Sequence, residues 1–96
     1  MDDSHTTLQA TVRGFVQGVG FRVFVRSTAW RLNLKGFVRN MPDGTLQVTA
    51  SGSRPSLDVL LAELRRGPAG SHVTAVDTAW HRGEQEGLNI PFEVRF

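Results

Sequence analysis

The spacing of apolar residues switches along this chain between a period of two and a period of about 3.6, and this alternation restricts the fold more than any other feature. Residues 8–15 alternate apolar and polar side chains, as in a strand with one buried face. After the glycine-rich segment 16–20, residues 21–32 carry apolar side chains at helical spacing, and Asn33 can close the helix in a left-handed conformation. The first third of the chain therefore predicts a strand, a break and a helix.

The segment 34–51 predicts a hairpin around Pro42, Asp43 and Gly44, because Pro fixes the first turn residue and Gly supplies a positive φ. The turn also fixes the register of the two strands. The expected pairs are Asn40 with Leu46, Val38 with Val48, and Gly36 with Ala50. These six residues form the face that a helix must cover. We expect the opposite face to be largely solvated, with the residues Lys35, Phe37, Arg39, Thr45, Gln47 and Thr49.

A second helix is predicted from Ser53, a candidate N-cap, to the stop at Gly67 and Pro68. A fourth strand over 73–80 has an irregular pattern that predicts either a bulge or a different strand boundary, and its inward face stays open. The alternation in 92–96 predicts a short final strand. The order βαββαβ plus one strand predicts an α/β two-layer sandwich (α+β), with two helices on one face of an antiparallel or mixed sheet.

Composition and length limit the class of protein. A chain of 96 residues is long enough for one domain, and 40% hydrophobic with 21% charged residues is typical of a folded globular protein. Cysteine is absent, which removes disulfides, thiolate nucleophiles and Cys-ligated metals. We expect residues 1–6 to be a mobile polar N-terminus and 7–96 a single domain. No apolar run suits a membrane span or a secretory signal, which predicts a cytoplasmic protein without a membrane partner.

Charge is distributed unevenly. No acidic residue occurs between Asp3 and Asp43, a window with a local charge of +6, whereas residues 43–96 carry five Arg and seven acids. The basic residues of the window are Arg13, Arg22, Arg26, Arg31, Lys35 and Arg39. This asymmetry favours an anionic partner for the first half of the chain. The alternative interpretation is a solvated basic face without a ligand.

The glycine-rich segment is the strongest candidate for an anion site. It leaves a strand and opens a helix, where backbone N–H groups lack intrahelical partners and the helix dipole is positive. Arg22 falls in the first helical turn, where a cation is unfavourable to the dipole unless an anion is bound. The alternative is a glycine-rich connection with a surface Arg. The spacing differs from that of a Walker loop.

Asn40 is a second candidate. It is a polar amide at the end of an otherwise apolar row, and the first helix must pack over that row. Its amide could therefore approach the glycine-rich segment, or alternatively cap the turn at Pro42 and Asp43.

These residues resemble the acylphosphatase family. The resemblance rests on the segment Val12–Arg22, followed by Ala29, Leu32, Gly36-Phe37-Val38-Arg39-Asn40 and Asp43-Gly44. It implies a ferredoxin-like sandwich that hydrolyses acyl phosphates to a carboxylate and inorganic phosphate, without a metal or cofactor. Phe37 stands where the family usually has Trp, and Asn33 where it often has Gly; either residue can meet the same requirement.

The resemblance also implies roles for individual residues. The phosphate-binding residues would be Gln17, Gly18, Val19, Gly20, Phe21 and Arg22, and the catalytic residues Arg22 and Asn40, with Asn40 orienting the attacking water. Inorganic phosphate is then expected as product and inhibitor of a monomeric enzyme. A further hypothesis places the carboxylate of Phe96 against Arg22. His72 and His81 fall on opposite faces of a regular strand, so a metal site is not expected.

The alternative function is a non-catalytic phosphate- or RNA-binding module of the same fold. Arg13, Lys35 and Arg39 are interleaved with Phe15 and Phe37 on the face expected to be solvated. The motif Lys35-Gly36-Phe37 matches the aromatic RNA-binding motif only in its first three positions, so nucleic acid is not the expected partner.

Overall fold

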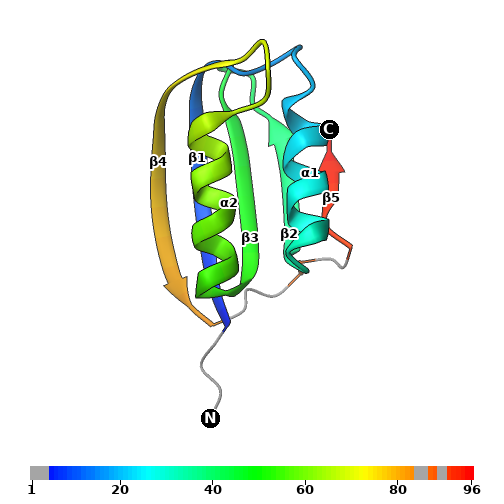
Figure 1. Ribbon diagram of the computed structural model, residues 1–96, viewed down its shortest axis with the longest axis vertical. Helices are drawn as coiled ribbons and strands as arrows, with labels where there is room; N and C mark the ends of the chain where they lie inside the picture. The colour runs from blue at the N-terminus through cyan, green and yellow to red at the C-terminus, as the bar shows by residue number, and fades with distance from the viewer. Residues whose placement is uncertain (1–4, 84–86, 89–90) are drawn as a thin grey trace.

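The computed structural model describes residues 5–83, 87–88 and 91–96, and it shows two helices packed on one face of a five-stranded sheet (Figure 1). The elements follow in the order β1 (His5–Phe15), α1 (Phe21–Arg31), β2 (Lys35–Asn40), β3 (Leu46–Ser53), α2 (Arg54–Arg66), β4 (His72–Arg82) and β5 (Glu93–Arg95). The predicted element order and the two-layer architecture are therefore confirmed. β1 begins three residues before the alternation that starts at residue 8. His5 and Thr6, which we expected in the mobile N-terminus, belong to this strand and pair with Ser53 and Gly52.

The strand order is β4-β1-β3-β2-β5, and the sheet is mixed. All neighbouring strands are antiparallel except β2 and β5, which run parallel. The predicted hairpin register is confirmed: Gly36 pairs with Ala50, Val38 with Val48, and Asn40 with Leu46. This topology places the β1–α1 loop, the β2–β3 turn and the C-terminal end of β5 at the same end of the sheet, where β1, β2 and β5 finish (Figure 1).

The core lies between the helices and the sheet. The apolar positions of both helices are buried there, as their spacing predicted: Phe21, Val25 and Ala29 of α1, and Leu57, Leu60, Leu61 and Leu64 of α2. Ser53 caps α2 by accepting a hydrogen bond from the Ser56 N–H. Asn33 takes a left-handed conformation at φ 58°, which ends α1 and turns the chain into β2.

β4 contains the irregularity that its pattern predicted. The register with β1 shifts between Arg13 and Gly14, and this shift turns Val73 as well as Val76 and Trp80 toward the core. The inward face that the sequence left open is therefore defined by these three residues.

The face of the sheet opposite the helices is less solvated than predicted. Thr45 and Thr49, expected among its exposed residues, are only 7% and 2% exposed. β3 is the central strand, and Thr49 lies in register between Gln9 of β1 and Phe37 of β2. The longer side chains of these neighbours cover the short threonine.

Candidate active site

The β1–α1 loop presents an uncapped helix N-terminus. Gly18 and Gly20 have φ values of 77° and 76°, a region that side-chain-bearing residues rarely adopt. Gly20 is the N-cap of α1, where no side chain accepts a hydrogen bond from the helix and no acidic residue occupies the first turn. The free N–H groups and the positive end of the helix dipole therefore face an open position suited to an anion.

Gln17 connects this loop to the β2–β3 turn. Its side-chain Nε2 donates to the backbone oxygens of Met41 and Thr45, at 3.0 and 2.9 Å. The Met41 N–H in turn donates to the Thr45 oxygen at 2.8 Å, so the same two residues close the turn. The loop is thereby fixed relative to Asn40, which immediately precedes Met41.

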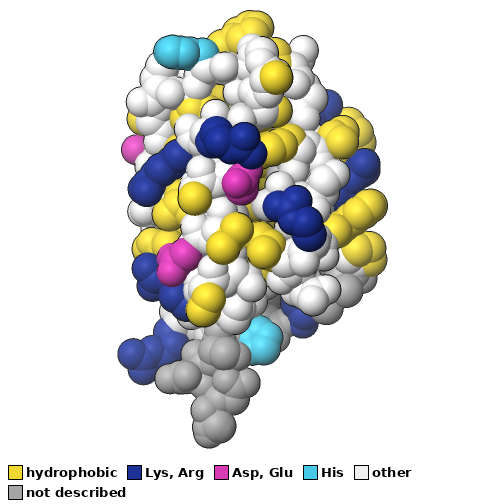
Figure 2. All heavy atoms as spheres, viewed as in Figure 1, with side chains coloured by type: hydrophobic (Ala, Val, Ile, Leu, Met, Phe, Trp, Pro, Cys, Tyr) yellow, Lys and Arg dark blue, Asp and Glu magenta, His cyan; other side chains and the backbone are white. Residues whose placement is uncertain are grey.

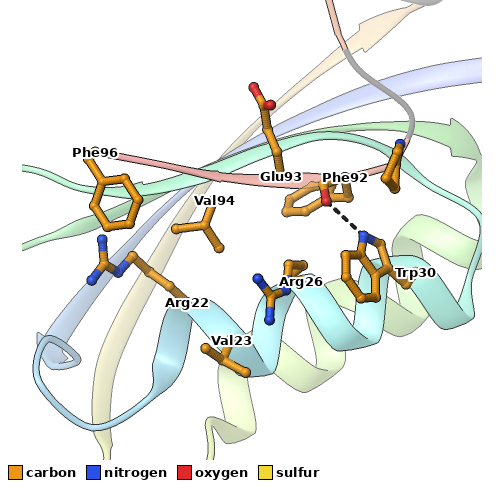
Figure 3. A pocket seen from close by; sticks show the side chains of 9 residues that line it. Arg22, Val23, Arg26, Trp30, Phe92, Glu93, Val94 and Phe96 are labelled. Carbon is orange, nitrogen blue, oxygen red and sulfur yellow. Dashed lines mark hydrogen bonds between the residues drawn. The ribbon is translucent and has the colours of Figure 1, made fainter.

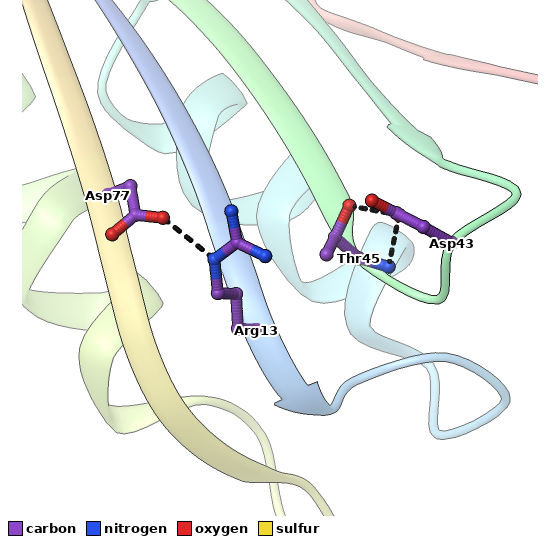
Figure 4. A network of polar contacts seen from close by, with 4 residues as sticks. All are labelled: Arg13, Asp43, Thr45 and Asp77. Carbon is purple, nitrogen blue, oxygen red and sulfur yellow. Dashed lines mark hydrogen bonds and ion pairs between the residues drawn. The ribbon is translucent and has the colours of Figure 1, made fainter.

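The turn is stabilised by Asp43, whose side chain accepts hydrogen bonds from the hydroxyl and the N–H of Thr45 (Figure 4). The hydroxyl, followed by the N–H, holds the pKa of the Asp43 carboxyl below its ordinary value. On the neighbouring strands Arg13 donates to Asp77 at 2.7 Å, and this hydrogen bond raises the pKa of the Arg13 guanidinium.

A small cavity of about 100 Å³ lies between the loop, the first turn of α1 and the end of β2. Its walls include Gly18, Gly20, Phe21, Arg22 and Asn40. The Oδ1 atom of Asn40 is buried and has no hydrogen-bond partner among the described residues. A buried carbonyl oxygen without a partner is an acceptor for a small polar molecule in the cavity.

Arg22 projects from the first turn of α1 and borders two hollows, this cavity and a larger groove. Its Cζ atom lies 4.8 Å from the centroid of the Phe96 ring, a cation–π distance. The hypothesis that Arg22 meets the Phe96 carboxylate is therefore not what the described residues show: the contact is with the ring. That contact stabilises a guanidinium that the helix dipole disfavours.

The structure brings together most of the predicted site residues. Gly18, Gly20, Phe21, Arg22 and Asn40 line one cavity, as expected from the resemblance. The side chain of Gln17 instead contacts the turn, and Val19 packs against the core, so any contribution of these two comes from the backbone. Gln17 as a link to the turn was not predicted, because no local pattern signals a hydrogen bond between segments so distant in the sequence.

Comparison with known proteins identifies the family. The acylphosphatase family model matches residues 8–90. The acylphosphatase of Thermus thermophilus is 43% identical over 81 residues, which cover 84% of this chain and 90% of that protein. The chain belongs to the acylphosphatase family. Family members are hydrolases, so the main functional prediction is favoured over the phosphate- or RNA-binding module, and the substrate class is small-molecule acyl phosphates.

Solved acylphosphatase structures share the fold over nearly their whole length. The Bacillus subtilis acylphosphatase has a TM-score of 0.89 at 32% identity and covers 95% of this chain and 99% of its own. The acylphosphatase from Coxiella burnetii has a TM-score of 0.85 at 36% identity, with coverages of 96% and 94%. The ferredoxin-like α+β fold is thus confirmed. Among the described residues no helix has the length and hydropathy needed to cross a membrane.

Proposed function

We propose that this acylphosphatase binds the phosphate group of its substrate with the backbone N–H groups of residues 17–21 and the guanidinium of Arg22. The uncapped N-terminus of α1 supplies N–H donors and positive potential, and Arg22 stands beside them in the first turn. A planar guanidinium with several donors matches the oxygens of a phosphate group. The phosphate therefore occupies the small cavity in this proposal.

Asn40 orients the attacking water. The observation that carries this assignment is the buried, unpartnered Oδ1 of Asn40 in the same cavity as Arg22. An amide oxygen accepts a hydrogen bond from the water but does not take its proton near neutral pH. Asn40 thus acts by position, and the proton passes to a phosphate oxygen of the substrate.

The reaction needs little more than position and charge. Water attacks phosphorus, the bond between phosphorus and the acyl oxygen breaks, and the leaving group departs as a carboxylate, whose pKa of about 4 makes a general acid unnecessary. Phosphoryl transfer has a loose transition state whose charge lies on the phosphate oxygens, where Arg22 and the N–H groups meet it. In this proposal the enzyme therefore works without a metal or cofactor. We also propose that it is a cytoplasmic monomer and that inorganic phosphate, its product, inhibits it.

The test is benzoyl phosphate hydrolysis in excess EDTA by the wild type, Arg22→Ala and Asn40→Ala. We expect metal-independent turnover by the wild type and a fall in kcat of about 10²–10³ in each variant, the cost of losing one preorganised donor or positioning group. Inhibition by phosphate should be weakened in Arg22→Ala and retained in Asn40→Ala, because of these two side chains only that of Arg22 contacts the phosphate.

Arg31→Ala is the matched control, since Arg31 is an exposed arginine in the last turn of the same helix. It should retain wild-type kcat. A wild type that folds but does not hydrolyse benzoyl phosphate, or an Asn40→Ala variant with full kcat, would contradict the assignments. Loss of activity in EDTA that Mg²⁺ restores would contradict the metal-free reaction.

A further inference from the structure

A groove of about 600 Å³ runs between α1 and β5 and adjoins the small cavity at Arg22 and Val23 (Figure 3). Its walls are largely apolar, with Val23 on the helix and Phe92 and Val94 on the strand side. Arg26 lies in its middle and Trp30 at its far end. The groove thus leads directly away from the proposed phosphate site.

Two arginines of α1 supply the charge of this groove. Arg22 and Arg26 are four residues apart on one face of the helix, an axial separation of about 6 Å. The acidic side chain among the lining residues, Glu93, is directed away from the helix, where it pairs with Arg95 on the other face of β5 (Figure 3). Glu93 is the one acidic side chain among the described lining residues, so no acidic side chain neutralises the helix side of the groove.

Arg26 is held in place without being saturated. The Trp30 Nε1–H donates to the Phe92 oxygen at 2.7 Å, which fixes the indole between α1 and the strand. The Arg26 Cζ lies 4.9 Å from the centroid of that ring. The Nε of Arg26 is buried without a hydrogen-bond partner, and its guanidinium makes no ion pair, among the described residues, so the charge of Arg26 stays uncompensated at the groove.

We propose that this groove holds the acyl part of the substrate and that Arg26 selects acyl groups carrying a second negative charge. The proposal rests on the proposed function, because Arg22 must hold the phosphate for the acyl group to point along α1. The apolar walls accept a short carbon skeleton, and Arg26 meets a carboxylate or phosphate placed about 6 Å further on, one helical turn from Arg22. Arg26 is thus a specificity-determining residue rather than part of the reacting centre.

The test uses two rigid substrates of equal shape, 3-carboxybenzoyl phosphate and its neutral analogue 3-carbamoylbenzoyl phosphate. The measured quantity is the ratio of their kcat/KM values. We expect the wild type to favour the carboxylate by about tenfold, the discrimination that a hydrogen bond between charged groups gives. Arg26→Gln should lower this ratio at least fivefold, and Arg26→Lys should restore part of it.

Arg31→Gln removes the same charge from α1 outside the groove and should keep the wild-type ratio. A purely structural role of Arg26 would change both substrates alike and leave the ratio unchanged, which would overturn the proposal. A wild-type ratio near one would also overturn it while leaving the proposed function intact. If the wild type hydrolyses neither of the two substrates, the proposed function is overturned and this inference with it.

Discussion

Gln17 shows how one side chain can determine the geometry of a site that it does not line. Its amide donates to two backbone oxygens of the β2–β3 turn, and this turn directly follows Asn40 at the end of β2. The distance between the β1–α1 loop and the Asn40 amide therefore depends on this residue. A long, neutral side chain with two N–H donors is required to reach both acceptors.

Replacing Gln17 with Ala should lower both stability and kcat. The loss of two hydrogen bonds is expected to cost about 1–3 kcal/mol in the free energy of unfolding, measured by urea denaturation. The kcat for benzoyl phosphate should fall because loop and Asn40 are no longer held at a fixed separation. Gln9→Ala, which removes one exposed hydrogen bond to His81, is the control and should leave kcat unchanged. Unchanged kcat in Gln17→Ala would contradict the positioning role.

Asn33 follows α1 at a backbone position that must adopt a left-handed conformation. Its φ of 58° demands a left-handed conformation, which Asn tolerates better than most residues with a side chain. Asn33→Ala should lower the free energy of unfolding by about 1 kcal/mol, whereas Asn33→Gly should leave it nearly unchanged. Urea denaturation of the three proteins measures the difference. Equal stability of the Ala and Gly variants would show that the backbone angle is not the cause.

The hydrogen bonds of Asp43 in the β2–β3 turn predict that the stability of the fold depends on pH. The pKa of Asp43 is lowered in the folded state by the hydroxyl and N–H of Thr45. A carboxyl of this kind stabilises the fold when the pH is above its ordinary value of 3.8, and the contribution disappears as the pH falls through the lower, folded value. Asp43→Asn should therefore remove part of the loss of stability on acidification below about pH 4, measured by thermal unfolding between pH 2 and 7. An identical pH profile in the variant would contradict this account.

At the scale of elements, the sequence predicted what short-range patterns control. Apolar periodicity located both helices and the long strands, and the Pro42-Asp43-Gly44 turn determined the register that brings Asn40 opposite Leu46. The parallel pairing of β5 with β2 could not be predicted, because a three-residue strand carries too little pattern to choose a neighbour or a direction. The groove between α1 and β5 depends on that pairing and was missed for the same reason.

At the scale of the whole molecule, the basic residues between Asp3 and Asp43 have different environments in the fold. Basic side chains are spread over the helix-covered side with few acidic ones between them (Figure 2). Arg13 pairs with Asp77, whereas Arg22 and Arg26 line hollows between α1 and the sheet. Charge asymmetry indicated an anionic partner but could not separate these residues, because their partners come from distant parts of the chain.

The interior position of β1, between β4 and β3, has a consequence for folding kinetics. Leu8 pairs with Ala50 on one side and with Trp80 on the other, so β1 acquires neighbours only from distant parts of the sequence. Closing such long loops is slow, so we expect this domain to fold more slowly than helical bundles, whose contacts are mostly local. β1 and β2 meet only through β3, which joins the loop after β1 to Asn40 at the end of β2. Enzymatic activity should therefore reappear during refolding only when β1 and β2 have both paired with β3. A chain whose helices have formed before this pairing would be inactive.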